Sequence, residues 1–354
     1  MIPEEIIEIP ARPDRSQFRS QYFDAARAAG FQLCGVAPAA PVGDYPLYQQ
    51  WVAEDFAGPM AYLADHRAAL RADPRSLLPS ARSVLCLGRL YNTPGPPAPV
   101  SRYAWGAADY HHVLRDGLAA LVRTLEGFWG SFEYKICIDT APLLERSLAR
   151  QAGLGWIGRN TCLINQSSGS WFFLGEILTS VELAPDTPSP GCCGSCTRCV
   201  DACPTQALVP APGGGWRLDA RLCISTWTIE QRGVLPEQHR AASGSHVFGC
   251  DICQQVCPWN SRAPFTEEPA FQRANPGLDL AELAALTPET FRERFRKTPL
   301  WRAKYAGLMR NAATAMGNSG DPRHIGPLRR LVLHPDQAVS QHALWALRRL
   351  EHDA

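Results

Sequence analysis

The sequence predicts an α/β (α+β) domain, a small ferredoxin-like domain and a C-terminal α-helical, HEAT-like repeat. Three observations predict this order. Helical and strand patterns alternate up to about residue 185, nine of the thirteen cysteines fall between 191 and 265, and a cysteine-free helical texture follows from about residue 275. A chain of 354 residues also exceeds one ordinary core. We place the domains at 1–185, 186–265 and 266–354.

The first domain mixes helices with buried strands. Residues 16–30 (SQFRSQYFDAARAAG) form a predicted helix that ends at a glycine. Apolar runs predict three strands, separated by a second long helix. The strands are expected at 31–39, 81–91 and 132–139, and the helix at 109–129. Alternation of this kind is typical of α/β proteins.

The cysteine-rich segment follows a proline-rich stretch (APDTPSP, 184–190) and contains two runs with iron–sulfur spacing. The first, CGSCTRCVDACP from Cys193, has the C-x2-C-x2-C-x3-C-P spacing of a two-cluster bacterial ferredoxin. The second, CDICQQVCP from Cys250, ends in the same way. In such ferredoxins the cysteine before the proline binds the other cluster. The two runs therefore predict two [4Fe-4S] clusters with exchanged ligands.

Eight ligands are expected, and Cys223 completes the count because it lies alone between the two runs. Cys192 is the alternative to Cys193, although the spacing favours Cys193. A zinc site is the alternative to a cluster, but zinc leaves the paired Cys-Pro endings unexplained. The expected ligands are Cys193, Cys196, Cys199 and Cys257 for one cluster and Cys203, Cys223, Cys250 and Cys253 for the other. Cys34, Cys86, Cys137 and Cys162 are predicted to be small buried hydrophobes.

The C-terminal part is helical, weakly repetitive and basic. Ala312, Ala315 and Met316 recur as Ala343, Ala346 and Leu347, a spacing of 31 residues that favours helical repeats of the HEAT type. Residues 292–354 contain 12 Lys and Arg against 5 Asp and Glu, whereas the rest of the chain contains 23 against 29. This imbalance predicts a polyanion-binding surface, and the alternative is an ordinary solvated helical face.

The segment CIDTAPLLERSLARQAGLGWIGRNTC, from Cys137 to Cys162, is the most unusual part of the first domain. Asp139 ends an apolar strand and precedes a helix, so a helix N-cap is its ordinary explanation. Three glycines further on have G-x-G-x-x-G spacing, but they follow a helix and not a strand. This context argues against a dinucleotide-binding site.

DTAPLLERSLARQAGLGWIGRN, CGSCTRCVDACPTQAL, RLCISTWTIEQRG and GCDICQQVCPWN together resemble the epoxyqueuosine reductase family, in the same order and over most of the chain. The resemblance implies an oxidoreductase that removes the epoxide oxygen of epoxyqueuosine at the wobble position of tRNA, giving queuosine. It implies that two [4Fe-4S] clusters pass electrons to a cobalamin bound by the first domain. The implied partners are a tRNA with a GUN anticodon carrying epoxyqueuosine and an unidentified electron donor, and we expect a monomer.

The resemblance also assigns residues. Asp139 corresponds to the proton donor of the family, and a carboxyl whose pKa is raised by burial suits that role. Trp105 and Trp227 are candidates for stacking on the wobble base, which must leave its stack to react. The implied cobalamin positions are Arg71, Arg102, Asp139, Leu163, Ser225 and Asp251. The candidate phosphate contacts are Lys304, Arg310, Arg323, Arg329 and Arg330.

Some features are expected to be absent. Asp109-Tyr-His111 approaches the D-x-H-x-x-G cobalamin motif but lacks its glycine, so no histidine ligand to cobalt is expected. The N-terminus has no export pattern and no apolar run is long enough to span a bilayer. We therefore expect a cytoplasmic protein with reduced thiols and no membrane contact. The alternatives are a reductive dehalogenase, which would be exported, and a non-catalytic electron carrier, in which the Asp139 segment would have no role.

Overall fold

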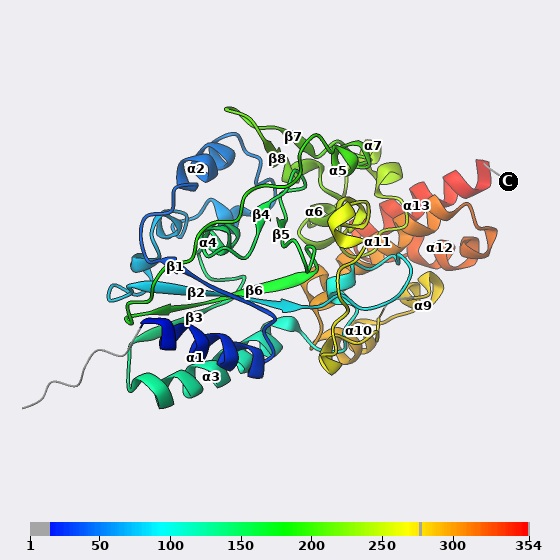
Figure 1. Ribbon diagram of the computed structural model, residues 1–354. Helices are drawn as coiled ribbons and strands as arrows, with labels where there is room; N and C mark the ends of the chain where they lie inside the picture. Colours follow the sequence, from blue (N-terminus) through cyan, green and yellow to red (C-terminus); the bar gives the residue numbers. More distant parts are fainter. Residues whose placement is uncertain (1–14, 276–277, 353–354) are drawn as a thin grey trace, which may run out of the picture.

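The computed structural model describes residues 15–275 and 278–352. The first 14 residues, on which the expectation about export rests, lie outside this range. Three regions follow one another along the chain: a sheet with helices on both faces, a segment of short helices that contains most of the cysteines, and a C-terminal block of helices (Figure 1).

A four-stranded sheet organises the first region. Its strands are, in spatial order, β1 (Leu33–Pro38), β2 (Ser83–Leu90), β6 (Phe172–Thr179) and β3 (Tyr134–Cys137). All neighbouring pairs are antiparallel, so the region is α+β and the parallel sheet of an α/β protein is not formed. β6 is not among the predicted strands, although it is almost as completely buried as β2. The other three strands and both long helices confirm the predictions.

The two faces of the sheet are covered by different helices. α1 (Arg15–Ala28) and α3 (Tyr110–Trp129) lie side by side on one face, and α4 (Glu145–Gln151) packs on the other (Figure 1). Successive side chains of a strand point to opposite faces. Leu85 of β2 therefore packs with α1 and α3, whereas Cys86 packs with α4. A further helix, α2 (Tyr45–Ala53), follows β1.

The cysteine region is built from short elements, and its two Cys-Pro runs fold alike. The helix α5 (Arg198–Asp201) contains Cys199 and precedes Cys203, while α8 (Ile252–Gln255) contains Cys253 and precedes Cys257. These two helices pack against each other, as expected for a duplicated ferredoxin-like unit. The other elements are β4 (Trp156–Ile157), β5 (Leu163–Ile164), β7 (Leu208–Pro210), β8 (Trp216–Leu218), α6 (Ile224–Ile229) and α7 (Glu237–Arg240).

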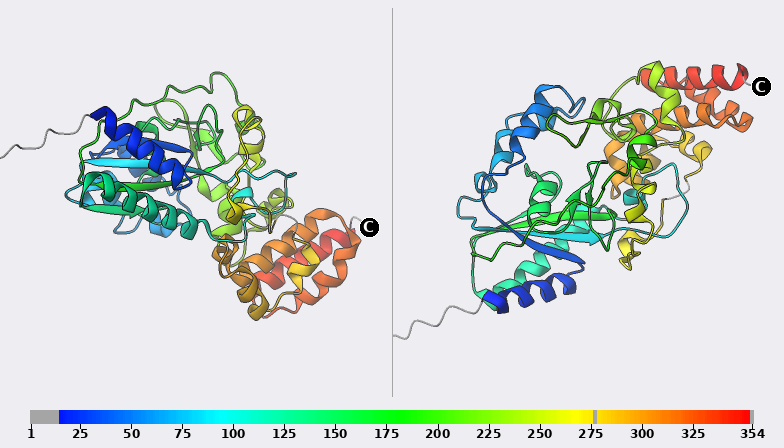
Figure 2. Two further views of the ribbon diagram at one scale, coloured as in Figure 1. Left: turned by 60° about the horizontal axis from the view of Figure 1, so that its bottom comes forward. Right: turned by 45° about the horizontal axis from the view of Figure 1, so that its top comes forward.

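The C-terminal block contains α9 (Leu280–Ala284), α10 (Pro288–Phe295), α11 (Lys304–Ser319), α12 (Ile325–Val332) and α13 (Gln337–His352). It lies at the opposite end of the molecule from α1 (Figure 2). The alanines of the 31-residue repeat are buried where α11 meets α13, and a Cβ on Gly317 would lie 2.6 Å from Cα of Ala346. The helical texture is thus confirmed, while the HEAT assignment stays a prediction. Among the described helices, none is both long and apolar enough to cross a bilayer.

The regions share their hydrophobic cores. Val100 and Trp105 of the first region are buried in the core of the C-terminal helices, and Val100 forms a β-bridge with Phe248. In the other direction, Phe271 follows the last cysteine and packs in the core of α1 and α3. The domain limits therefore stay predictions, because contacts cross each of them.

Candidate active site and cluster-binding cysteines

Asp139 lies just beyond β3 in an unusual backbone conformation. Its φ is +40°, which residues other than glycine rarely adopt. Its Oδ2 accepts hydrogen bonds from the Tyr110 hydroxyl and from Nε2 of His111, each at 3.0 Å. The side chain is 54% exposed, so a substrate can reach the carboxyl group. Asp139 is not a helix cap, because α4 has Leu144 at its N-cap, and that ordinary explanation is wrong.

His111 connects Asp139 to a second carboxylate. Its Nδ1 lies 2.7 Å from Oδ1 of Asp109, which also caps α3, and its ring stacks on Tyr110 with centroids 4.2 Å apart. Burial acts to lower the pKa of His111, but the hydrogen bonds to Asp109 and Asp139 outweigh it and raise the pKa to about 9. At neutral pH His111 is therefore an imidazolium between two carboxylates.

The expectation of a raised pKa for Asp139 is wrong. Partial burial acts to raise this pKa, but His111, the Tyr110 hydroxyl and the charge of Arg302 lower it overall. Asp139 is thus ionised near neutrality, and the proton of the pair resides on His111. Sequence reasoning cannot find this pairing, because the two residues are 28 positions apart and His111 belongs only to an incomplete cobalamin motif.

Arg302 brings the C-terminal region to the edge of this site. Its guanidinium pairs with Glu230 at 3.1 Å and lies over the Tyr62 ring, 5.4 Å from the ring centroid. Its charge also acts on Asp139. Because Tyr62 belongs to the first region and Glu230 follows α6, all three regions of the chain meet beside Asp139. Neither Arg302 nor Tyr62 belongs to a recognisable motif.

Seven of the eight expected cluster ligands have other expected ligands as neighbours, in two separate groups. Burial and the neighbouring thiols of Cys257 and Cys193 raise the pKa of Cys199 to about 11. Burial raises the pKa of Cys250 to about 12, with contributions from Cys223 and Cys203. These are the neighbours that exchanged ligands require. Within the described parts of the chain no three side chains converge on a single metal ion. Thiolates of a [4Fe-4S] cluster need not do so, because each binds a different iron.

The segment that follows Asp139 also reaches the first group of cysteines. Trp156 of β4 donates its indole N–H to Sγ of Cys193 at 3.4 Å, and its ring meets Trp259 edge to face, with centroids 5.0 Å apart. A Cβ on Gly155 would lie 2.1 Å from the carbonyl oxygen of Ile164. Hairpin packing therefore explains this glycine, and no nucleotide is needed.

The four remaining cysteines behave differently from one another. Cys86 and Cys137 are buried, as predicted, whereas Cys34 and Cys162 are partly exposed. The Cys162 thiol lies near the thiol of Cys253, and this neighbour lowers the pKa of Cys162. Cys162 is therefore a neighbour of the second group and more than a packing residue.

The predicted cobalamin positions differ in their freedom to bind. Arg71 is 6% exposed, and its Nη1 is shielded without a hydrogen-bond partner among the described residues. Leu163 is buried on β5, and Ser225 is half-buried in α6. The Arg102 guanidinium is bonded to the loop at 92–95, and its backbone N–H donates to Oδ2 of Asp251 at 2.6 Å. These last two side chains already have protein partners.

The structure contradicts three predictions about RNA contact. Arg310 is 2% exposed and donates to the carbonyl oxygens of Trp227, Gln231 and Gly233, so it cannot reach a phosphate. Trp105 and Trp227 are also buried, and their indole N–H groups donate to backbone carbonyls, so neither can stack on a base. The other four predicted phosphate contacts are exposed: Lys304, Arg323, Arg329 and Arg330.

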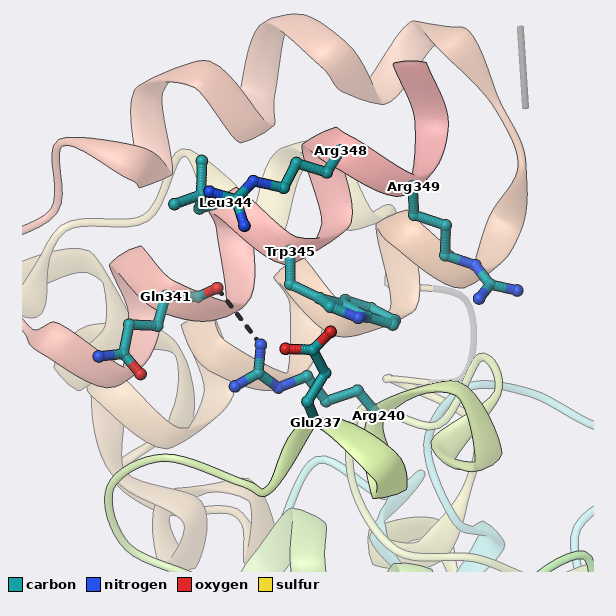
Figure 3. A pocket seen from close by; sticks show the side chains of 7 residues that line it. All are labelled: Glu237, Arg240, Gln341, Leu344, Trp345, Arg348 and Arg349. Atoms are coloured by element: carbon teal, nitrogen blue, oxygen red, sulfur yellow. Dashed lines mark hydrogen bonds between the residues drawn. The ribbon is translucent and has the colours of Figure 1, made fainter. Parts of the chain in front are cut away.

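A basic pocket of about 350 Å³ lies between α7 and α13. Arg240, Arg348 and Arg349 line it around Trp345, with Glu237 as the one carboxylate among the lining residues (Figure 3). The guanidinium carbons of Arg240 and Arg349 lie 5.9 and 5.7 Å from the Trp345 ring centroid. The basic composition of this end was noted from the sequence, but this particular grouping was not.

Two family models match parts of the chain that carry these features. Residues 71–140 match the model described as epoxyqueuosine reductase QueG, DUF1730, and residues 192–260 match a 4Fe-4S double cluster binding domain. The first match includes Asp139 and His111, and the second includes all eight expected ligands.

Whole-chain relatives and solved structures agree. The chain is 42% identical to the epoxyqueuosine reductase of Xanthomonas campestris, covering 95% of this chain and 97% of the relative. It is 39% identical to that of Pseudomonas aeruginosa, over 99% of both chains. A crystal structure of epoxyqueuosine reductase with an epoxyqueuosine-modified tRNA-Tyr stem loop has a TM-score of 0.84 at 28% identity, covering 95% of this chain and 91% of that one. Because the similarity extends from end to end and includes the Asp139 segment and both cysteine runs, the chain belongs to the epoxyqueuosine reductase family.

Proposed function

We propose that this protein reduces epoxyqueuosine at the wobble position of tRNA to queuosine. The Asp139–His111 pair carries the proposal, since it is an acid–base pair open to a substrate in a chain 42% identical to an epoxyqueuosine reductase. The reaction uses two electrons and two protons, leaves a carbon–carbon double bond and releases the epoxide oxygen as water. The chain must therefore supply an electron route, a proton source and an RNA-binding surface.

The electron route consists of two [4Fe-4S] clusters, one bound by Cys193, Cys196, Cys199 and Cys257 and the other by Cys203, Cys223, Cys250 and Cys253. Soft thiolate donors suit iron–sulfur clusters, and the mutual influence of these thiols supports the division into two groups. An external donor, not identified by the sequence, supplies the electrons.

Cobalamin would be held by Arg71, Leu163 and Ser225. The fit rests on Arg71, whose Nη1 is a shielded donor without a protein acceptor and suits a carboxamide oxygen of the cofactor. Bound cobalamin would supply a cobalt centre that delivers electrons to the epoxide. We do not assign Arg102 and Asp251 to the cofactor, because each is bonded to the protein. His111 is no cobalt ligand in this proposal, because both of its ring nitrogens face carboxylates.

Asp139 and His111 would together deliver the proton to the departing oxygen. His111 holds this proton at neutral pH, and its Nε2 lies 3.0 Å from Oδ2 of Asp139. Asp139 is the more exposed of the two and would present the proton to the substrate, with His111 restoring it. This arrangement replaces the burial-raised carboxyl expected from the sequence.

The tRNA would contact the exposed cations of the C-terminal region: Lys304, Arg323, Arg329 and Arg330. The basic pocket around Trp345 adds Arg348 and Arg349 to this surface. Contacts with phosphates are salt-dependent and independent of base sequence. We place the protein in the cytoplasm, with its tRNA.

An anaerobic conversion assay tests the proposal. Protein with both clusters and cobalamin loaded is incubated with a strong reductant and GUN-anticodon tRNA carrying epoxyqueuosine, and the nucleosides are analysed by mass spectrometry. We expect conversion to queuosine by the wild type and a loss of at least about a hundredfold in Asp139→Asn, since this change removes a general acid. No conversion by the loaded wild-type protein would falsify the assignment.

A further inference from the structure

Two glutamates lie behind the Asp139 loop, on the side away from solvent. Glu176 is 0% exposed on β6, in register with Cys86 of β2 and Cys137 of β3. Glu145 is the first residue of α4, which covers this face of the sheet. The two carboxyl groups contact each other. Buried glutamates are rare unless a cation or a hydrogen bond compensates them, so this pair requires a physical explanation.

Among the described residues, no group compensates two negative charges at this place. Both carboxyl oxygens of Glu176 and Oε1 of Glu145 are shielded and lack hydrogen-bond partners among the described residues. The titratable groups that act on the pair are Cys86, Cys137, Asp139 and Arg146. Only Arg146 is cationic, and its guanidinium is exposed and bonded to the Thr161 carbonyl. Touching carboxyl groups in such surroundings must retain a proton between them.

Glu145 also contacts the backbone that carries the proposed proton donor. The backbone N–H of Asp139 faces the Glu145 carboxyl group closely enough to act on its pKa. This is the peptide whose residue has a φ of +40°, and such a conformation persists only where the surroundings impose it. Glu176 lies on the inner strand β6 and contacts Glu145 from the sheet side. The chain of contacts therefore runs from the sheet through both glutamates to Asp139.

We propose that Glu145 and Glu176 form a protonated acid pair that positions Asp139. The positioning role rests on the proposed function of Asp139. The acid pair itself does not depend on a substrate or a cofactor. Burial and the charge of Asp139 raise the pKa of Glu145 to about 8, and burial and Glu145 raise that of Glu176. Both glutamates are positioning residues, because their carboxyl oxygens are shielded from solvent and cannot touch a substrate.

Infrared spectroscopy of the loaded enzyme without tRNA tests for the proton. A protonated carboxylic acid has a carbonyl stretching band distinct from the carboxylate bands. We expect this band in the wild type at pH 6.5, weakening as the pH rises through about 8. We expect it to vanish in the Glu145→Gln/Glu176→Gln double variant and to persist in Glu182→Gln, which changes an exposed glutamate paired with Arg82. A wild type without the band, or a double variant that keeps it, overturns the proposal.

Kinetics test the positioning role. Glu145→Leu removes the carboxyl group that the Asp139 N–H faces, so kcat should fall at least about tenfold with KM for tRNA unchanged. Glu145→Gln retains an acceptor oxygen and should recover most of that loss. The positioning role is wrong if Glu145→Leu retains the wild-type kcat. It is also wrong if Glu145→Leu loses activity with clusters and cobalamin bound and Glu145→Gln is equally inactive. A loaded wild type that shows the band but converts no epoxyqueuosine contradicts the proposed function and leaves the acid pair intact.

Discussion

At the scale of single residues, the charge on Asp139 depends on its neighbours, above all on His111. His111 contacts Asp139 at 3.0 Å and Asp109 at 2.7 Å. These contacts raise the pKa of its imidazole to about 9, so His111 is protonated at neutral pH. The same contacts favour ionised carboxylates at both ends. The proton of the pair therefore resides on His111, whereas the sequence predicts that Asp139 holds it.

Replacing His111 tests this assignment. We expect His111→Ala to lower kcat at least about tenfold, because the Asp139 carboxyl loses its proton source. The matched control is His112→Ala, since His112 is an exposed neighbour on the same helix. Single-turnover conversion of epoxyqueuosine measures the effect, and equal rates for both variants would contradict the role of His111.

The His111 contacts also predict a pH dependence of stability. The folded-state pKa of about 9 lies above the ordinary value of 6.5, so the stabilisation is complete below pH 6.5 and is lost as the pH rises to about 9. The loss amounts to at most about 3 kcal/mol, from 1.36 kcal/mol per pKa unit. Urea unfolding of the wild type and His111→Ala at several pH values should show curves that converge towards pH 9. A difference that stays constant with pH would contradict the prediction.

At the scale of elements, two short helices organise the cysteines. α5 and α8 each present one cysteine and are each followed by a Cys-Pro pair, so the exchanged ligands of the two runs lie across the contact between the helices. Cys223 at the N-cap of α6 completes the second group, although 26 residues separate it from Cys250. A ligand so far from its motif is recognised only because two [4Fe-4S] clusters need eight cysteines and the two runs supply seven.

Two cysteine variants distinguish a ligand from its neighbour. Cys223→Ser should reduce the iron content from about eight to about four atoms per chain, because one [4Fe-4S] cluster loses a ligand. Cys192→Ser should leave all of the iron in place, since Cys192 is exposed and lies outside the ferredoxin spacing. Iron and sulfide analysis with electron paramagnetic resonance measures both. Loss of a cluster in Cys192→Ser would shift the register of the first run.

At the scale of the whole molecule, polar side chains and shared cores hold the C-terminal helices against the cysteine region. Arg310 of α11 donates to three carbonyl groups of residues 227–233, and Asn311 donates to Thr228 and Val247. Arg302 extends this contact to the edge of the Asp139 site. The C-terminal block is therefore a wall of the active site as well as a basic surface.

We expect Arg310 to stabilise the fold and not to bind RNA. Arg310→Ala removes the donor to three carbonyl groups, of which that of Trp227 is buried, and leaves a cavity in the core, so we expect a loss of about 2–4 kcal/mol in the free energy of unfolding. Arg323→Ala, at an exposed position, should change it by no more than about 0.5 kcal/mol. Chemical unfolding of the two variants provides the comparison, and equal stabilities would refute the structural role.

The basic surface should bind tRNA through phosphates. Charge reversal in Arg329→Glu/Arg330→Glu should weaken binding and reduce the slope of log K against log salt by about 1.5, as for two lost phosphate contacts. Arg82→Glu is the control, because Arg82 is exposed on the first region. Fluorescence anisotropy with an anticodon stem loop at several salt concentrations measures both quantities. An unchanged salt slope would remove these arginines from the RNA-binding surface.

Features that depend on local spacing can be read from the amino-acid sequence alone. Cys-x2-Cys runs bind clusters through short loops, and helical or strand periodicity places apolar side chains on one side, so both cysteine groups, both long helices and three strands were predictable. The strand β6 was not, although it is buried on both faces like the predicted β2, because Gly175 and Glu176 interrupt its apolar run and both residue types are depleted in strands. Only the tertiary structure could place His111 against Asp139, Glu145 against Glu176 and Arg310 inside the protein. Charge, burial and proton affinity are properties of a residue's neighbours, and folding brings those neighbours from distant parts of the chain.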